Sequence, residues 1–290
     1  MKRKEFLKLM ALLSITGGFM NQEETEARSQ GEIMPVFFFG HGSPMNAIEE
    51  NQFSKTWQSI GKSLPKPTAI LCISAHWETR GTFITAMPKP PTIHDFGGFP
   101  KALFDVQYPA PGNPSLAKEI QKGFKYTQLG LDEDWGLDHG TWSVLKHVFP
   151  KADVPVLQLS LNHNQKPEYH YELAKELRAL RKKGVLIVGS GNTIHNLRLV
   201  DWNKVHEPSY GFDWAIEANT KIKQWVQNGR HDELIKFKSQ GKAFDLAIPT
   251  PEHYLPLLYT LGLQEEKDRI EIFNDKEVMG SLAMTSFRFG

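Results

Sequence analysis

Four histidines are the residues of this 290-residue chain best suited to metal or acid-base chemistry. They share no local motif, but each lies in a short segment rich in Gly, Ser or Pro. The four are His41, His76, His195 and His253. Imidazole is the commonest metal ligand in proteins and the usual general base near neutral pH. We therefore predict that these side chains form one mononuclear metal site.

Strands must position the first three of these histidines, because each comes after an apolar run of β-forming residues. The runs are residues 36–39, 69–73 and 185–188. In open α/β sheets, ligands bind beyond the carboxyl ends of the strands, so imidazoles delivered by several strands converge there. The glycines on both sides of His41 are predicted to let the backbone approach a bound ion or substrate.

Two choices stay open from residue types alone. Prolines stiffen the backbone on both sides of His253, and either Glu252 or His253 is expected to face the metal. His195, in the segment after the third apolar run, is either a metal ligand or the general acid/base beside the metal.

Aromatic and glycine-rich segments add candidate substrate contacts. His139 is bracketed by glycines and tryptophans, which favours a pocket residue that hydrogen-bonds a polar substrate group. Trp77, next to a histidine, is predicted to line an apolar pocket. His94 and Asp95 form an acid-base pair within residues 87–113, a long proline-rich stretch that we interpret as an active-site wall.

Short apolar runs alternate with amphipathic stretches from residue 33 onward, which is typical of an α/β fold. We predict a single domain with a central, largely parallel sheet flanked by helices and an active site at the strand C-terminal ends. Strands are expected at residues 36–39, 69–73, 82–86, 154–159 and 185–188. Helices are expected at residues 114–125 and 169–183, where apolar residues recur at helical spacing.

The composition favours a small-molecule substrate. The chain has 34 basic and 33 acidic residues, a net charge of +1 and no long block of one sign, so no nucleic-acid partner is expected. Cys72 is the only cysteine, which excludes an intramolecular disulfide. Its place in an apolar run predicts a buried, inert thiol.

The first 32 residues differ from the rest. A basic start precedes an apolar stretch, residues 9–20, that is too short for a membrane span but suits a signal-peptide core. The order Arg-Lys-x-Phe-Leu-Lys at residues 3–8 resembles a twin-arginine export signal with one arginine replaced by lysine. We predict an export-signal-like segment and polar linker over residues 1–32, leading to the periplasm, and a catalytic domain over residues 33–290. An ordinary N-terminal helix on a cytoplasmic protein is the alternative.

Six segments, in order along the chain, resemble those of a known family. They are Gly40-His41-Gly42-Ser43-Pro44-Met45, Ser74-Ala75-His76-Trp77, Pro91-Thr92-Ile93-His94-Asp95-Phe96-Gly97-Gly98-Phe99-Pro100, Trp135-Gly136-Leu137-Asp138-His139-Gly140, Gly191-Asn192-Thr193-Ile194-His195-Asn196-Leu197 and Thr250-Pro251-Glu252-His253-Tyr254-Leu255-Pro256. The sequence resembles the class III extradiol ring-cleavage dioxygenases of the LigB superfamily, in the branch of 4,5-DOPA dioxygenase-like proteins. The resemblance runs from about residue 34 to the C-terminus.

The resemblance implies a role for each histidine. His41, His76 and His253 resemble the metal ligands, and His139 resembles a pocket histidine that contacts the substrate. His195 resembles the catalytic histidine beside the metal, and also a fourth ligand in zinc-loaded members. The implied reaction cleaves a catechol ring beside its diol with O2. Fe(II) is expected for this activity, because zinc has no accessible redox state, although Zn(II) also suits the site.

One departure from the usual iron site supports two alternatives. The common iron triad has two histidines and one carboxylate, whereas this chain offers three or four neutral imidazoles, which also suit zinc. A zinc-dependent hydrolase or hydratase is the first alternative. A non-catalytic protein that binds a metal or a small molecule is the second.

Overall fold

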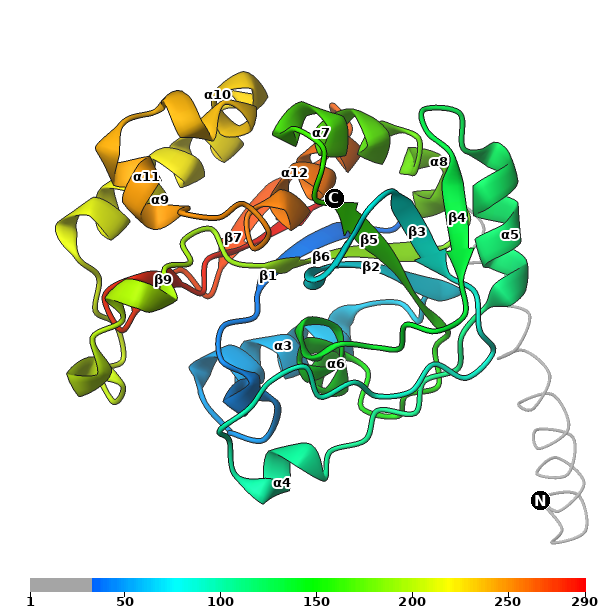
Figure 1. The fold of residues 1–290 in the computed structure, drawn as a ribbon, viewed down its shortest axis with the longest axis horizontal. Helices are drawn as coiled ribbons and strands as arrows, with labels where there is room; N and C mark the ends of the chain where they lie inside the picture. Colours follow the sequence, from blue (N-terminus) through cyan, green and yellow to red (C-terminus); the bar gives the residue numbers. More distant parts are fainter. Residues whose placement is uncertain (1–32) are drawn as a thin grey trace, which may run out of the picture.

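The computed structural model describes residues 33–290, so the export signal predicted within residues 1–32 lies outside the described residues. The strands, in chain order, are β1 (Val36–Gly40), β2 (Ala69–Thr79), β3 (Thr82–Thr85), β4 (Leu129–Asp132), β5 (Val156–Asn162), β6 (Val185–Gly191), β7 (Ile270–Phe273), β8 (Glu277–Val278), β9 (Leu282–Ala283) and β10 (Ser286–Phe289). They alternate with helices in the first two thirds of the described chain, as the sequence pattern predicts (Figure 1).

The helices vary widely in length. The α-helices are α3 (Gln52–Ser63), α4 (Lys101–Phe104), α5 (Pro114–Gly123), α6 (His139–Val148), α7 (Pro167–Lys175), α8 (Arg178–Arg181), α9 (Asp213–Gln227), α10 (His231–Ile235), α11 (Lys242–Ala247) and α12 (Leu255–Leu263). Short 3-10 helices are η1 (Pro44–Ala47), η2 (Leu197–Leu199), η3 (Trp202–Lys204) and η4 (Phe237–Ser239). Among residues 33–290, no helix has both the length and the apolar composition needed to cross a bilayer.

Eight strands form one sheet in the order β4-β3-β5-β2-β6-β1-β10-β7. Its centre is parallel, since β2 pairs in parallel with both β5 and β6, and β6 pairs in parallel with β1. The antiparallel pairings are those of β10 with β1 and β7, and of β3 with β5. The expected α/β domain with a largely parallel central sheet is therefore confirmed.

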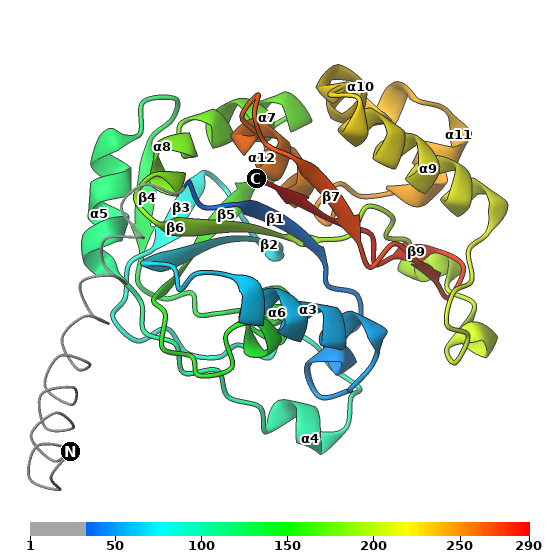
Figure 2. The same cartoon turned by 180° about the vertical axis from the view of Figure 1, so that it is seen from behind.

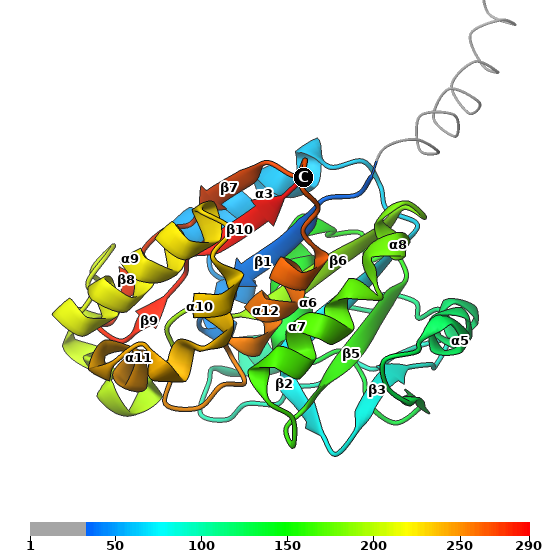
Figure 3. The same ribbon diagram turned by 90° about the horizontal axis from the view of Figure 1, so that it is seen from above.

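Helices cover both faces of the sheet, with α3 and α6 on one face and α7 and α12 on the other (Figures 1 and 2). Side chains alternate along each strand to fill the two layers. On β1, Val36 and Phe38 join the apolar cluster under α7 and α12, while Phe37 and Phe39 join the cluster with α3 and α6. The view from above shows α12 and α7 lying along the sheet (Figure 3).

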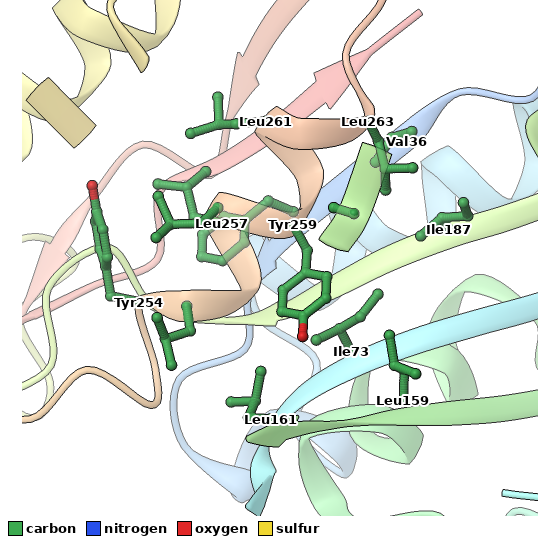
Figure 4. Packing of buried hydrophobic residues seen from close by; sticks show 14 of the residues in the cluster. Val36, Ile73, Leu159, Leu161, Ile187, Tyr254, Leu257, Tyr259, Leu261 and Leu263 are labelled. Carbon is green, nitrogen blue, oxygen red and sulfur yellow. The ribbon is translucent and has the colours of Figure 1, made fainter. Parts of the chain in front are cut away.

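Helix α12 is apolar around its whole circumference and is buried throughout. Figure 4 shows the Tyr259 side chain of α12 pointing toward Ile73 of β2 and Leu159 of β5, in the same apolar cluster as Leu257. This packing fixes the segment just before α12, which carries His253, against the carboxyl ends of the strands.

Two predicted elements differ in the structure. The strand predicted at residues 69–73 continues to Thr79, because a register shift between Ile73 and Glu78 lets β2 keep pairing with β5. The sequence predicted His76 in a loop after the strand. In the structure it lies within an irregular segment of β2. The single helix predicted at residues 169–183 is divided into α7 and α8, although both pieces bury the predicted apolar face.

Candidate metal centre

Three imidazoles from distant parts of the chain meet beyond the strand ends. One ring nitrogen each of His41, His76 and His253 lies within 4.8 Å of the others. His41 directly follows β1, His76 lies in β2 and His253 precedes α12. The Nε2 atoms of His41 and His76 are 3.1 Å apart. The structure thus brings these three predicted residues together.

Ser190 sets which nitrogen of His41 carries the proton. The Ser190 hydroxyl, on β6, donates its hydrogen to the Gly140 carbonyl, which can only accept. Its oxygen lies 3.0 Å from Nδ1 of His41 and must therefore accept a hydrogen bond from that nitrogen. Nε2 of His41 is consequently the unprotonated nitrogen, and it faces His76.

Asp95 orients two further imidazoles. Its Oδ2 lies 2.9 Å from Nδ1 of His139 and 3.2 Å from Nδ1 of His76, and its Oδ1 accepts from the His139 backbone N–H. Burial alone would raise the pKa of Asp95, but the hydrogen bonds from His139 and the nearby charges of His139 and His76 outweigh it and lower that pKa. The carboxylate therefore accepts from Nδ1 of His139 and leaves Nε2 of His139 as an acceptor, and its position near Nδ1 of His76 favours the same tautomer there.

Glu252 holds the third imidazole. Its Oε1 lies 3.0 Å from Nδ1 of His253, which leaves Nε2 of His253 as the acceptor nitrogen. His253, and not Glu252, belongs to the group with His41 and His76. Glu252 belongs to a second possible metal-binding group, with His195 and His253. The geometry favours His253 as the ligand and Glu252 as its hydrogen-bond partner.

These proton positions test whether a metal fits the site. With Nδ1 of His41 protonated, Nε2 of His41 carries a lone pair and lies 3.1 Å from Nε2 of His76. Burial lowers the pKa of His41 and of His253 well below the ordinary value, and neighbouring imidazoles lower it further. Burial and His139 likewise lower the pKa of His76 to about 3. Neutral, converging imidazoles are the donor set that a divalent transition metal requires.

His195 lies beside the three imidazoles. Its ring stacks on His253 with centroids 3.5 Å apart and planes 9° apart. Its backbone N–H donates to the Ala247 carbonyl at 2.9 Å, and it forms a β-bridge with Leu282. Burial lowers the pKa of His195 to about 4, with Glu252 opposing the shift. His195 is thus a neutral base that lies next to the candidate ligands.

A cavity of about 370 Å³ opens over this cluster. Its polar lining comprises His41, Ser43, His76, Asp95, His139, His195 and His253. Its apolar lining includes Phe96, Phe99, Leu197, Val200, Trp202 and Leu282. The volume is typical of a pocket for a small organic ligand.

Comparison with known proteins identifies the family. The family described as the catalytic LigB subunit of aromatic ring-opening dioxygenase matches residues 35–290. The chain belongs to the LigB family. It is 45% identical to the 4,5-DOPA dioxygenase extradiol of Escherichia coli K12 over 261 residues, which cover 89% of this chain and 95% of that protein.

Other relatives place this LigB-family chain in the same branch. It is 36% identical to the 4,5-DOPA dioxygenase extradiol of Beta vulgaris, over 90% of this chain and 98% of the relative. A crystal structure of an uncharacterized Escherichia coli K12 protein is similar, with a TM-score of 0.77 and 40% identity. That similarity covers 89% of this chain and all of the other, and it supports the predicted extradiol dioxygenase fold.

Two predicted substrate contacts lie away from the cavity of this LigB-family site. Trp77 is buried and stacks on Trp135 with ring centroids 5.7 Å apart. Adjacent side chains on a strand point to opposite faces, so His76 faces the cavity and Trp77 does not. His94 donates from Nε2 to the Val106 carbonyl oxygen, 3.0 Å away, and is not among the residues that line the cavity. Both predictions are corrected, whereas Asp95 lines the cavity.

Glycines at the ends of β1 and β6 allow close approach of neighbouring chain segments. A Cβ on Gly40 would lie 2.5 Å from the Met284 carbonyl oxygen, and a Cβ on Gly191 would lie 2.1 Å from that of His253. Gly191 thereby allows the His253 segment to reach β6. Gly42, on the other side of His41, lines the cavity.

Several residues of the site were not predicted from the sequence. Ser190 is one of several serines in glycine-rich segments, and only the fold places it against His41. Leu197, Val200 and Trp202 lie in η2, η3 and the link between them, where the sequence shows no periodic pattern. The aromatic content of the proline-rich wall did point to Phe96 and Phe99 as a group, although not as individual contacts.

Proposed function

We propose that this LigB-family protein is an extradiol dioxygenase that cleaves a catechol with O2 at one divalent metal ion held by His41, His76 and His253. The observation that carries the proposal is the convergence of three neutral imidazoles at the base of a cavity of ring-binding size, with hydrogen-bond acceptors at Nδ1 of His41 and His253 and the Asp95 carboxylate 3.2 Å from Nδ1 of His76. The family match favours ring opening over the zinc hydrolase and the non-catalytic alternatives.

His195 is the proposed acid/base. Its low pKa keeps the imidazole neutral at physiological pH, so it can accept a proton from a catechol hydroxyl. Stacking on His253 holds the ring beside the ligand cluster. The protonated ring can return this proton after ring opening.

His139 and Asp95 are proposed to position the substrate. Asp95 holds Nδ1 of His139, which leaves its Nε2 to accept a hydrogen bond from the second catechol hydroxyl. Asp138 caps α6 by accepting from the Thr141 backbone N–H, so His139 is fixed at the first residue of that helix. Phe96 and Phe99 provide apolar contacts for the ring and exclude water from it.

Fe(II) is the proposed catalytic ion. When bound, it supplies the one-electron chemistry that allows triplet O2 to react with a closed-shell catechol, which Zn(II) cannot supply. The neutral nitrogen donors also suit Zn(II), so a purified sample is expected to contain either ion.

The test is metal analysis of anaerobically purified protein, paired with oxygen uptake and visible absorption on a panel of catechols. DOPA, the substrate named for the Escherichia coli and Beta vulgaris relatives, belongs in the panel. We expect oxygen uptake and a yellow ring-cleavage product with Fe(II) but not with Zn(II). Absence of uptake on every catechol at full iron occupancy would rule the proposal out.

Export remains a separate proposal for residues 1–32. The basic start and apolar stretch support a twin-arginine-like signal. Fractionation of a bacterial host should place the protein in the periplasm with a shortened N-terminus, and a variant with Arg3→Ala and Lys4→Ala should stay in the cytoplasm. An equal periplasmic fraction for the wild type and the variant would contradict export.

A further inference from the structure

Asp138, which directly precedes His139, is a fully buried carboxylate outside the lining of the cavity. Two further buried side chains, Ser74 and Gln158, contact it. The Ser74 hydroxyl donates to Oδ1 of Asp138 at 2.7 Å, and Nε2 of Gln158 donates to Oδ2 at 2.6 Å. We call these three side chains the Asp138 network. Buried polar groups whose hydrogen bonds are all formed hold the chain around them in one arrangement.

The network joins the start of α6 to two central strands of the sheet. Gln158 lies in β5 and Ser74 lies in β2, which pairs in parallel with β5. The Asp138 backbone N–H donates to Oε1 of Gln158 at 3.0 Å, so the amide group turns its Nε2 toward the carboxylate. Every hydrogen-bonding group between these residues thus has a defined direction.

One branch of the network reaches the candidate metal ligand His76. The Ser74 oxygen, whose hydrogen goes to Asp138, accepts from the His76 backbone N–H at 3.3 Å. His76 lies beyond Ser74, the last β2 residue paired with β6, and between Ile73 and Glu78, the nearest β2 residues paired with β5. A side chain therefore holds the backbone of His76 where both strand ladders are interrupted.

The other branch fixes His139. Oδ1 of Asp138 also accepts from the Thr141 backbone N–H at 3.0 Å, which makes His139 the first residue of α6. Asp95 then holds the ring of His139 through Nδ1. The backbone position of His139 thus depends on Asp138, and its ring orientation depends on Asp95.

The two branches meet where the first turn of α6 lies against β2. A Cβ on Gly140 would lie 2.5 Å from Oγ of Ser74 and 2.9 Å from Cδ2 of His76. The rings of His76 and His139 have centroids 3.9 Å apart. Packing this close leaves little room for one branch to move without the other.

We propose, resting on the dioxygenase function above, that Asp138 is a positioning residue that holds the metal ligand His76 and the substrate contact His139 at one fixed separation. Asp138 touches neither the ion nor the substrate, and it acts through Ser74 and the first turn of α6. A catechol that contacts the ion and His139 together requires this separation, because its ring is rigid. A displacement of about 1 Å in such a site costs up to about 100-fold in rate.

An exchange of the acid and the amide tests the network. In Asp138→Asn, either orientation of the new amide places its nitrogen against another donor, Nε2 of Gln158 or the Thr141 N–H. In the double variant Asp138→Asn with Gln158→Glu, the new amide donates to the new carboxylate, which also accepts from the backbone N–H of residue 138. Its oxygen still accepts from Ser74 and Thr141. The double variant therefore restores every hydrogen bond of the network.

Two dissociation constants report the two branches. Competition with a chelator gives that of Zn(II), and titration of Zn(II)-loaded protein gives that of catechol, both at a temperature where circular dichroism shows each variant folded. We expect Asp138→Asn to weaken both by about tenfold, and the double variant to return each to within about threefold of the wild type. Wild-type constants in folded Asp138→Asn, or no recovery in the double variant, would overturn the proposal.

Ser74→Ala isolates the branch to His76. It should weaken Zn(II) binding by about tenfold but change catechol binding less than Asp138→Asn does, because Thr141 still caps α6 on Asp138. If Asp138→Asn does not fold, a wild-type Zn(II) constant in Ser74→Ala overturns the proposal.

Tyr259→Phe is the control for loss of a buried hydrogen bond. Its hydroxyl contacts Nδ1 of His170 on the opposite face of the sheet, so its removal should lower stability and leave both constants unchanged. Equal weakening in this control would mean that the effect is structural. Neither constant requires turnover, so absence of ring cleavage at full iron occupancy, with these binding results intact, would count against the dioxygenase function alone.

Discussion

The Ser190 hydroxyl oxygen lies 3.0 Å from Nδ1 of His41 and can only accept there, because its one hydrogen goes to the Gly140 carbonyl. This single contact fixes the proton on Nδ1 and leaves Nε2 free for a metal. Second-sphere partners of this kind typically contribute 10- to 100-fold to metal affinity. The tautomer of a candidate ligand is thus set by a residue on the neighbouring strand.

Ser190→Ala is expected to weaken metal binding by about 10- to 100-fold, because the His41 ring loses its orienting acceptor. Competition with a chelator measures the affinity. Ser143→Ala, which removes another buried hydroxyl but one without a hydrogen-bond partner, is the control. Equal weakening in both variants would mean that packing, and not the tautomer, is responsible.

Asp95→Asn is expected to lower kcat/KM for catechol cleavage by about 10- to 100-fold, since the amide replaces one acceptor oxygen by a donor and can no longer accept from both the backbone N–H and Nδ1 of His139. Metal content, measured alongside, shows how much of the loss comes from His76. Asp105→Asn is the control, because Asp105 is an exposed carboxylate of the same proline-rich stretch and pairs with Lys101. Full activity of Asp95→Asn would contradict the positioning role.

Substitutions at residues 252 and 253 distinguish ligand from orienting group. His253→Gln should lose bound metal, because it removes one of three ligand nitrogens. Glu252→Gln should keep one ion per chain but bind it about 10- to 100-fold more weakly, because it only loses the charged partner of Nδ1. Metal content after dialysis distinguishes the two roles. Loss of the ion from Glu252→Gln, with retention in His253→Gln, would identify Glu252 as the ligand.

His195→Gln is expected to retain metal and to bind catechol while lowering kcat by about 10²- to 10⁴-fold, the usual contribution of a general acid/base. In the wild type, the pKa of His195 near 4 means that the ring becomes protonated only as the pH falls toward that value. Between pH 7 and pH 5.5, kcat should therefore show little loss from this group. A steep fall centred near 6.5 at constant metal content would show that His195 has an ordinary pKa.

The sequence predicted what depends on local pattern. Apolar runs followed by glycine and histidine gave both the parallel sheet and the placement of His41 at its edge. The same reasoning misjudged Trp77, because strand alternation turns it away from the cavity once His76 lies within β2. Local pattern could place a segment at the site but not decide which of two neighbouring side chains faces it.

Other features depend on contacts between residues far apart in the chain. His253 meets His41 and His76 only in the folded chain, and Ser190 meets His41 only because β6 lies beside β1. Trp202, which lines the cavity, belongs to a segment whose sequence has no helical or strand periodicity, so no local pattern identifies it as a site residue. Each of these features is tertiary, and a single sequence carries no local signal for it.

His170 provides a pH test of the fold that does not involve the metal centre. It is fully buried in α7, and its Nδ1 lies 3.1 Å from the Tyr259 hydroxyl of α12. Burial lowers its pKa to about 4, whereas the unfolded chain has the ordinary value of 6.5. Above pH 6.5 neither state binds this proton, so the residue causes no pH dependence there. As the pH falls from 6.5 toward 4, the unfolded state gains a proton that the folded state does not, and the free energy of unfolding decreases.

The expected loss from His170 is about 3 kcal/mol over that interval, at about 1.4 kcal/mol for each pKa unit. His170→Gln should be less stable at pH 7, because it loses packing, but its stability should fall less on acidification. Urea unfolding of metal-free protein at pH 7, 6 and 5 measures both curves, with His206→Gln at an exposed position as the control. The stability difference between wild type and His170→Gln should therefore shrink as the pH falls, because protonation of the unfolded wild type removes the advantage of the native ring. Parallel curves for the two proteins would show that His170 does not titrate differently in the folded state.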